Sequence, residues 1–353
     1  MNSAQATLEK AVTHHVIVGA GLIGSYLGCV LLLNKQTVQF VARGQWIEVL
    51  SGSVRLTDFN GNDNTVSPDN VAEPAQVSPP ADIVWLTVKC TAVTDTLPLL
   101  KKLIGPDTLI LCCQNGLGSH APVVSAFPDN EVWQVMVPFN VVLQHADHLH
   151  RGSEGSLIIG AATERAVQVS DMLSHDMLPV ETTHDIRSVL WAKLQLNLGN
   201  SVNALCDKPV KAMLQNRYCR RVIAMLMQEW LDVAKAKGVQ LPKVARVPGW
   251  LIPHIMRLPD WLFTRLAGAM LAIDPTVKTS MWWDLSQGKL TEIEFLNGAV
   301  VKEAQKLGLA TPVNLAIMRA IREAEEQNAA GARYSPWTCQ ALYKLAMRAT
   351  HRE

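Results

Sequence analysis

The sequence predicts an α/β protein of two domains, with strands and helices alternating in the first and helices dominating the second. Two observations support this class. Short apolar runs at residues 15–18, 81–88 and 108–113 have the composition of strands buried on both faces of a parallel sheet. Further along, the pattern becomes helical, and 353 residues exceed what one core usually contains. We place the domains at residues 14–180 and 181–353.

Charge and composition exclude several classes of protein. The net charge of +1 provides no broad basic surface for a nucleic acid. A hydrophobic content of 48% with 18% charged residues is typical of a globular chain and not of a disordered one. No apolar run approaches the roughly 20 residues that span a bilayer. The first 15 residues contain no apolar segment typical of a secretory signal.

The seven cysteines contain no CxxC pair and lie in apolar runs. We therefore expect neither a disulfide framework nor a zinc site. We interpret the cysteines as small core residues, which indicates a protein of a reducing compartment, the cytoplasm. They are Cys29, Cys90, Cys112, Cys113, Cys206, Cys219 and Cys339.

A glycine-rich turn joins the first strand to the first helix. It follows the strand at 15–18 and precedes an apolar helix at 25–33 and a second strand at 37–42. In this context the first glycine permits a tight turn, the second lets the backbone approach a pyrophosphate, and the third lets helix and strand pack closely. The pattern predicts dinucleotide binding by Gly19, Ala20, Gly21, Leu22, Ile23 and Gly24.

The end of the second strand distinguishes between two cofactors. An NAD enzyme usually has Asp or Glu there to bind the ribose 2′-hydroxyl, whereas this chain has Arg43 after Ala42. Because a guanidinium suits a 2′-phosphate, we predict NADPH over NADH. The alternative is that Arg43 is merely a surface charge.

Lys89 and Asn115 follow the two later buried strands. Ligands of open α/β sheets bind outside the carboxyl ends of the strands, so both residues are site candidates. The alternatives are a charge at a helix start for Lys89 and an ordinary Asn-Gly turn for Asn115.

Further β structure is expected on both sides of these strands. Residues 52–61 suggest a hairpin that turns at Asn60-Gly61. Strands at 131–142 and 155–159 are expected to pair antiparallel through a turn near 150–152. His145, His148 and His150 lie between them, and we interpret them as the solvated surface of a polar turn and expect no metal.

A mid-chain helix at residues 187–205 is the central feature of the predicted second domain. It is mostly apolar, but Lys193, Asn197 and Ser201 recur every four residues and would form a polar stripe. Read alone, the stripe is a solvent-facing edge of an amphipathic helix. A second long helix is expected at residues 210–238.

Residues 246–275 are apolar and contain two tryptophans, with frequent interruptions by prolines and charges. Two interpretations remain open, a packing or homodimer surface and a lid or membrane-touching segment. Residues 279–298 follow, in which Ser280 and Asp284 could cap a helix and Glu292 could be an acid in a first helical turn.

The chain resembles the ketopantoate reductase family, the NADPH-dependent 2-dehydropantoate 2-reductases, over residues 19–314. The resemblance rests on separated motifs in a fixed order: G-A-G-L-I-G, the strand end at Lys89, Q-N-G-L-G, L-W-x-K-L-x-x-N, S-M-x-x-D, T-E-I-E-F-L-N-G and T-P-V-N. It implies a Rossmann-type NADP-binding domain, a helical substrate-binding domain and an active site in the cleft between them. The implied reaction reduces ketopantoate to pantoate in pantothenate and coenzyme A synthesis.

The resemblance also implies roles for individual residues. Lys193 matches the general acid that protonates the substrate oxygen, and Glu292 matches a glutamate near the bound substrate and cofactor. Asn115 and Lys89 match positions near the cofactor and the reacting centre. The implied substrate contacts are Asn115, Lys193, Asn197, Ser201 and Ser280.

Two departures from the family pattern suggest a divergent member that reduces another 2-oxo acid. Ser201 stands in place of a second asparagine, followed by Val202 in place of proline, and residues 246–275 form a longer segment than is usual. A non-catalytic NADP-binding sensor is the alternative of a different class. The proton-transfer residue Lys193 argues against it, since a sensor needs no such chemistry.

Overall fold

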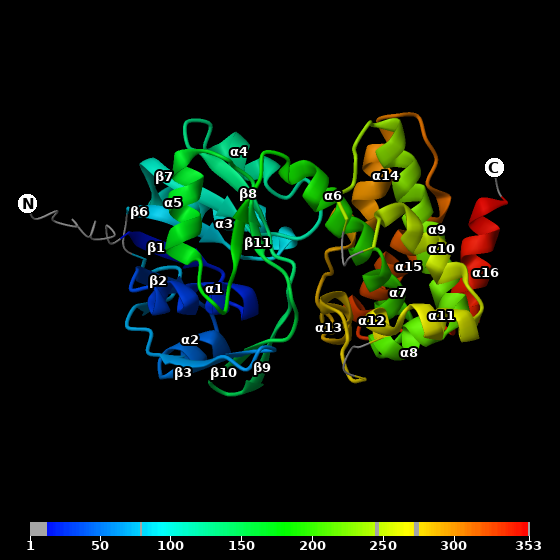
Figure 1. The fold of residues 1–353 in the computed structure, drawn as a ribbon, viewed down its shortest axis with the longest axis horizontal. Coiled ribbons are helices and arrows are strands. Elements are labelled where there is room, and N and C mark those ends of the chain that lie inside the picture. Colours follow the sequence, from blue (N-terminus) through cyan, green and yellow to red (C-terminus); the bar gives the residue numbers. More distant parts are fainter. Residues whose placement is uncertain (1–12, 78–79, 244–246, 272–274, 352–353) are drawn as a thin grey trace, which may run out of the picture. The chain divides into compact units, whose positions relative to one another are not determined.

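The computed structural model describes residues 13–77, 80–243, 247–271 and 275–351. These residues form two compact units (Figure 1). Unit 1 contains the described residues up to Gln114 together with His120–Ile186, and unit 2 contains Asn115–Ser119 together with the described residues from Arg187 onward. The boundary expected after residue 180 falls inside strand β12, which pairs with β11 and keeps residues 180–186 in unit 1.

Unit 1 is built on an eight-stranded sheet with the order β12-β11-β8-β7-β6-β1-β2-β5. All neighbouring strands are parallel except β8 and β11. Five helices and a short 3-10 turn connect the strands (Figure 1). The strands are β1 His14–Val18, β2 Thr37–Val41, β5 Val71–Ala72, β6 Ala81–Leu86, β7 Ile104–Cys112, β8 Val132–Met136, β11 Leu157–Ile159 and β12 Val180–Thr182, and the helices are α1 Leu22–Leu33, α2 Gln45–Leu50, α3 Val93–Leu103, α4 Ala121–Ala126 and α5 Glu164–Leu173, with the 3-10 turn η1 Cys90–Ala92.

Both faces of this sheet are buried, which explains the continuous apolar runs in its strands. On β1 and β6, Ile17 and Trp85 belong to the core cluster that includes α1 and α5 residues. Their neighbours Val16 and Val84 belong to a second cluster that includes α3 and α4 residues. Alternate side chains therefore enter opposite cores, as the period of two in a strand requires. The predicted α/β class and parallel strands are confirmed.

A second, four-stranded sheet in unit 1 has the order β4-β3-β10-β9. Its first hairpin, β3 Val54–Asp58 with β4 Asp63–Val66, confirms the predicted turn at Asn60-Gly61. The predicted turn at 150–152 was wrong, because the strand pair β9 Val141–His145 and β10 His148–Arg151 intervenes between β8 and β11. The three histidines lie on this intervening pair, where the Thr57 hydroxyl contacts His148 and His150.

His15 on β1 makes the stability of unit 1 dependent on pH. The ring is fully buried and its Nδ1 accepts a hydrogen bond from the Trp85 indole at 3.1 Å. Burial lowers the pKa of His15 to about 4. Between the ordinary pKa near 6.5 and about 4, only the unfolded chain binds this proton, so the free energy of unfolding falls as the pH falls, by about 1.4 kcal/mol per pH unit.

We expect urea unfolding of wild type to show this loss of stability between pH 7.5 and pH 5. His15→Gln should reduce the slope, whereas His14→Gln, at a half-buried neighbouring position, should keep it. Equal slopes in wild type and His15→Gln would contradict the assignment to His15.

Unit 2 is helical apart from connecting turns (Figure 1). Its helices are α6 Ile186–Asn197, α7 Gly199–Cys206, α8 Val210–Gln215, α9 Arg217–Ala236, α10 Ile252–Arg257, α11 Asp260–Leu266, α12 Gly268–Leu271, α13 Ser280–Ser286, α14 Asn297–Gln305, α15 Pro312–Ala329 and α16 Cys339–Thr350, with 3-10 turns η2 Gly249–Leu251 and η3 Ile293–Phe295.

Two helices expected to be continuous are each divided by one residue. The helix expected at 187–205 is interrupted at Leu198, whose carbonyl accepts the Ser201 hydroxyl, and such back-bonding bends helices. The helix expected at 210–238 is interrupted at Asn216, whose side chain accepts hydrogen bonds from the backbone of Tyr218 and Cys219 and so begins α9.

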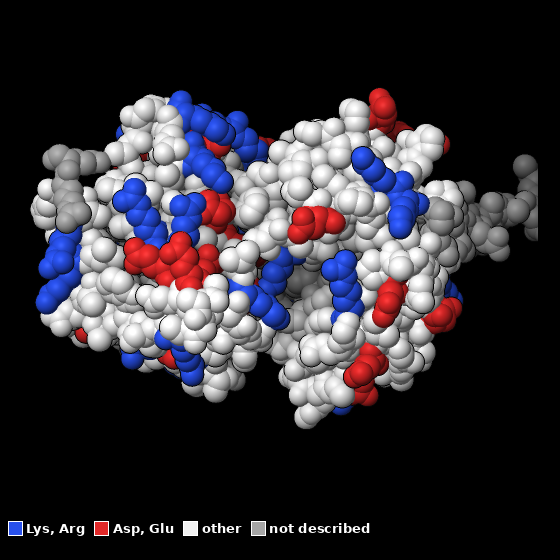
Figure 2. All heavy atoms as spheres, turned by 180° about the vertical axis from the view of Figure 1, so that it is seen from behind, with Lys and Arg blue, Asp and Glu red and all other residues white. Residues whose placement is uncertain are grey.

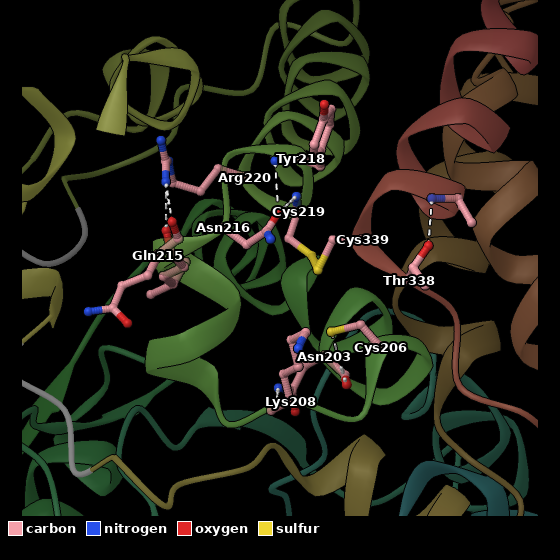
Figure 3. Close-up of a disulfide and its surroundings, with 12 residues drawn as sticks. Asn203, Cys206, Lys208, Gln215, Asn216, Tyr218, Cys219, Arg220, Thr338 and Cys339 are labelled. Atoms are coloured by element: carbon pink, nitrogen blue, oxygen red, sulfur yellow. Dashed lines mark hydrogen bonds between the residues drawn. A yellow bond between two sulfur atoms is a disulfide. The ribbon is translucent and has the colours of Figure 1, made fainter. Parts of the chain in front are cut away.

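The expectation that no cysteine forms a disulfide was wrong. Cys219 on α9 and Cys339 at the start of α16 are joined by a disulfide (Figure 3). Their separation of 120 residues left no spacing pattern to read. The Cys206 sulfur lies within 4.8 Å of both, and Cys206 is a buried free thiol.

The segment that the sequence places at 246–275 contains α10, α11 and α12, although residues 246 and 272–274 lie outside the described residues. It is anchored to α9 by the fully buried Arg220, which donates to the carbonyl oxygens of Met256 and Leu258 and stacks on Phe263 at 4.1 Å. Trp250 and Trp261 remain 63% and 71% exposed, so an apolar surface persists on this segment. No helix among the described residues has the length and apolarity to cross a bilayer.

Charged side chains are scattered on the face displayed in Figure 2, where basic and acidic groups are interspersed among neutral residues. This distribution agrees with the net charge of +1. It gives no indication of a polyanionic partner on that face.

Candidate active site

The glycine turn of unit 1 has the geometry that its sequence predicts. Gly19 has φ +94°, and a Cβ there would lie 2.5 Å from the Val88 side chain and 2.7 Å from its backbone nitrogen. A Cβ at Gly24 would lie 2.4 Å from the Thr87 hydroxyl. Thr87 and Val88, the two residues directly after β6, therefore leave no room for a side chain at either position, and both positions require glycine.

Gly21 differs, because a Cβ there would meet only the Gly19 oxygen, at 3.9 Å. The protein itself leaves this space open. Helix α1 begins beside it with Gly21 as the N-cap, with no side-chain cap and no acidic residue in its first turn. The positive end of the helix dipole is thus available to an anion, and these residues fit a dinucleotide pyrophosphate.

The turn lies at the point where the strand order of the sheet reverses, since β1 pairs with β2 on one side and β6 on the other. This is where open α/β sheets bind their ligands. Lys89 is exposed three residues after β6, and Arg43 is exposed two residues after β2. Both sequence-predicted cations therefore lie at the carboxyl ends of strands that neighbour β1.

Gln114 is a site-forming residue that sequence reasoning missed. It is buried, and its amide nitrogen donates to the carbonyl oxygens of Leu86 at 2.7 Å and Val88 at 3.2 Å. Gln114 therefore connects the end of β7 to the end of β6, immediately before Asn115. Its place in the Q-N-G-L-G motif was the available signal.

Lys193 and Asn115 meet in unit 2. The Lys193 ammonium donates a 2.6 Å hydrogen bond to the Asn115 side-chain oxygen, across 78 residues of sequence. Helix α6, which bears Lys193, is fixed on α9 because the Trp230 indole donates to the Trp191 carbonyl at 2.9 Å and the centres of the two tilted rings lie 4.2 Å apart. The structure thus brings together two residues that the sequence identified separately.

The loop after Asn115 is fixed against the turn that follows Glu292. Gly116 has φ +75°, and a Cβ there would lie 2.1 Å from the Phe295 oxygen, so only glycine fits. Leu117 donates its backbone N–H to the same oxygen at 3.1 Å. The Glu292 carbonyl in turn accepts the Phe295 N–H at 3.0 Å. Asn115, Lys193 and Glu292 are therefore connected through one continuous set of contacts within unit 2.

The other predicted substrate residues differ in accessibility. Asn197, one turn after Lys193, is half-buried, and Ser280 at the first position of α13 is exposed. Ser201 is fully buried, and its hydroxyl donates to the Leu198 carbonyl at 3.0 Å. In this conformation the Ser201 hydroxyl is used within its own helix, and its substrate role stays a prediction.

These features define a class of protein with a Rossmann-type nucleotide-binding unit and a helical unit carrying a lysine–asparagine pair. Two family models match: "Ketopantoate reductase PanE/ApbA" over residues 15–164 and "Ketopantoate reductase PanE/ApbA C terminal" over residues 185–325. Together they span most of the chain. The chain belongs to the ketopantoate reductase family, a family of NAD(P)H-dependent oxidoreductases.

Individual relatives agree with this placement. The 2-dehydropantoate 2-reductase of Archaeoglobus fulgidus is 27% identical over 315 residues, which cover 88% of this chain and 97% of the relative. The crystal structure of a PanE/ApbA family ketopantoate reductase from Ralstonia eutropha has a TM-score of 0.73 at 26% identity, covering 90% of this chain and 99% of that one. D-mandelate dehydrogenase with NADH and anilino(oxo)acetate also shares the fold, with a TM-score of 0.73 at 20% identity and coverage of 90% and 99%.

Proposed function

We propose that this protein uses NADPH to reduce a 2-oxo acid to the 2-hydroxy acid, with 2-dehydropantoate as the substrate and pantoate as the product. Pantoate would then serve pantothenate synthesis. The observation that carries the proposal is the 2.6 Å hydrogen bond between Lys193 and Asn115, because it fixes an ammonium group one turn from the half-buried Asn197. The names of the family and its relatives support the same reaction.

The residues of this chain perform complementary tasks in that reaction. A bound reduced nicotinamide supplies the hydride, and the open space at Gly21 would hold its pyrophosphate. Lys193 stabilises the negative charge that develops on the substrate carbonyl oxygen and donates a proton to it. Asn115 orients the Lys193 ammonium, while Asn197 and Ser280 donate hydrogen bonds to the substrate. Glu292 completes the site on the turn that supports the Asn115 loop.

A second candidate is a larger, aromatic 2-oxo acid. Two observations favour it: Ser201 is buried and offers no amide where the family has asparagine, and a protein of the same fold was crystallised with anilino(oxo)acetate. A site without that asparagine has one donor fewer for the hydroxyl group of ketopantoate.

Steady-state assays with NADPH and a panel of oxo acids test the proposed function. The panel contains ketopantoate, a small aliphatic 2-oxo acid and phenylglyoxylate, the 2-oxo acid of mandelate. We expect kcat/KM to be highest for ketopantoate. A higher value for phenylglyoxylate would establish the second candidate, and absence of turnover with every acid, with NADPH still bound, would establish a non-catalytic sensor.

The cofactor preference is tested at Arg43. We expect Arg43→Ala to raise KM for NADPH about tenfold or more and to leave KM for NADH nearly unchanged, since the guanidinium binds only the 2′-phosphate. Lys101→Ala removes an exposed cation of α3 in the same unit and should change neither value. Equal KM values for both cofactors in wild type would contradict the preference.

Assembly and location complete the proposal. We infer a homodimer, because the exposed Trp250 and Trp261 give unit 2 an apolar surface and a ketopantoate reductase of the same fold from Staphylococcus aureus is dimeric. We infer a cytoplasmic location from the reaction. Sedimentation of the purified protein tests the first inference, because a monomer at micromolar concentration would contradict it.

A further inference from the structure

A buried polar network connects α7 to the start of α13, where the S-M-x-x-D motif begins. Its centre is Asn203, which is fully buried. The Asn203 side-chain oxygen accepts two hydrogen bonds from Thr279, one from the backbone N–H and one from the hydroxyl, both at 3.0 Å. The Asn203 amide nitrogen donates to the Lys208 carbonyl at 2.6 Å (Figure 3).

Thr279 is the N-cap of α13, and its hydroxyl oxygen accepts the Trp282 N–H at 3.3 Å. Asn203 therefore orients the hydroxyl that caps α13. The next residue is Ser280, the exposed serine that the proposed function assigns to the substrate.

A second contact fixes the same helix start on its other side. Asp207, one residue after α7, accepts hydrogen bonds from the Lys278 ammonium at 2.9 Å and the Trp282 indole at 2.6 Å. The Lys278 ammonium also lies 3.5 Å from the centre of the Trp282 ring. The residues on both sides of Ser280 are thus bound to the end of α7.

Asn203 would not be needed for packing alone. An apolar side chain would fill the position without the cost of burying an amide, and a buried amide is retained where its hydrogen bonds fix one arrangement. Helix α7 follows α6 after a single residue, and α6 bears Lys193 and Asn197. Any group fixed to α7 is consequently fixed relative to these two residues.

We propose that Asn203 is a positioning residue that sets Ser280 relative to Lys193 and Asn197 and so determines affinity for the oxo acid. This inference rests on the proposed function, because Ser280 has to contact the substrate. It goes beyond that function by assigning the geometry of the substrate site to a residue that does not touch the substrate.

The test compares variants of the whole protein by steady-state kinetics. Asn203→Leu and Thr279→Val should each raise KM for the oxo acid about tenfold, with kcat and KM for NADPH nearly unchanged, as expected when uniform binding is lost. Thr279→Ser keeps the capping hydroxyl and should restore the wild-type KM. If Asn203→Leu does not fold, Thr279→Val carries the test.

Thr338→Val is the matched control. Thr338 is the N-cap of α16 and accepts the Ala341 N–H at 3.1 Å, as Thr279 does for α13, but α16 bears no proposed site residue (Figure 3). Thr338→Val should lower the unfolding temperature as Thr279→Val does and leave KM unchanged.

Three outcomes would overturn the inference, and they are distinguishable. If wild type turns over no oxo acid, the proposed function fails together with the inference. If Ser280→Ala leaves KM unchanged, Ser280 has no substrate role. If Ser280→Ala raises KM but Asn203→Leu and Thr279→Val do not, the proposed function stands and the positioning role of Asn203 is wrong.

Discussion

Replacing Lys193 by alanine is expected to lower kcat about 100-fold or more while the affinity for NADPH stays nearly unchanged. The reason is the position of the Lys193 ammonium, which donates to Asn115 at 2.6 Å on a helix fixed by the Trp191–Trp230 pair. Without it, the alkoxide that forms on hydride arrival has neither a proton donor nor a neutralising charge. Steady-state kinetics and fluorescence titration with NADPH measure the two quantities separately.

Lys235→Ala is the control for this result, because it removes an exposed lysine from the last turn of α9. It should leave kcat unchanged. Asn115→Ala should show an intermediate loss, since the ammonium remains but is no longer oriented. A Lys193→Ala variant with wild-type kcat would overturn the assignment of the general acid.

Replacing Cys339 by serine is expected to reduce the free energy of unfolding of unit 2 by about 2–5 kcal/mol. The disulfide closes a loop over a separation of 120 residues, and chain entropy gained in the unfolded state grows with the length of that loop. Urea unfolding with and without a reductant measures the effect. Wild type should lose stability in the reductant, whereas Cys339→Ser should be insensitive to it.

A thiol count provides the control. Denatured, unreduced protein should show five reactive thiols, because five of the seven cysteines are free. Cys113→Ser, which removes a cysteine of unit 1 that is not part of the disulfide, should retain the response of unit 2 to reductant. Seven reactive thiols in wild type would contradict the disulfide.

The Cys206 thiol, which lies next to the Cys219–Cys339 disulfide, should not react with it. Burial raises the pKa of the Cys206 thiol to about 11, so the thiol stays protonated at neutral pH. Only a thiolate attacks a disulfide. Cys219 and Cys339 are themselves almost completely buried, which protects the pair from a soluble reductant and makes it compatible with the cytoplasmic location that we propose.

The sheet of unit 1 was predictable because its signals are local. Strands buried on both faces are continuous apolar runs, and the glycine motif leads into the first turn of α1. The β9–β10 pair was missed because the mostly apolar run at 131–142 favoured a single strand, although Pro138 and Asn140 mark the break between β8 and β9. Asn216 did carry a capping signal, but the helical period continues across it and favoured one helix.

The candidate site was predictable residue by residue but not as an arrangement. Motifs identified Lys193, Asn115 and Glu292, while their connection through Phe295 required the fold. Asn203 was missed because the same segment also contains Asn197 and Asn200, and nothing in the sequence distinguishes the asparagine that is buried. The disulfide was missed because its two cysteines are brought together by the packing of α16 on α9.

The assignment of Asn115–Ser119 to unit 2 determines how the protein can be dissected. The chain passes from unit 1 to unit 2 before Asn115, returns after Ser119, and passes over again at Arg187. A fragment that begins at Arg187 would therefore lack the acceptor for Lys193 and the glycine that packs on Phe295. Likewise, a single proteolytic cut near residue 186 would divide unit 2 into two pieces, because Asn115–Ser119 would stay with the N-terminal fragment and contact the rest of unit 2 only through non-covalent bonds. The reaction proposed for Lys193 thus requires the intact polypeptide. Neither the segment before Arg187 nor the segment from Arg187 onward could be exchanged alone between relatives.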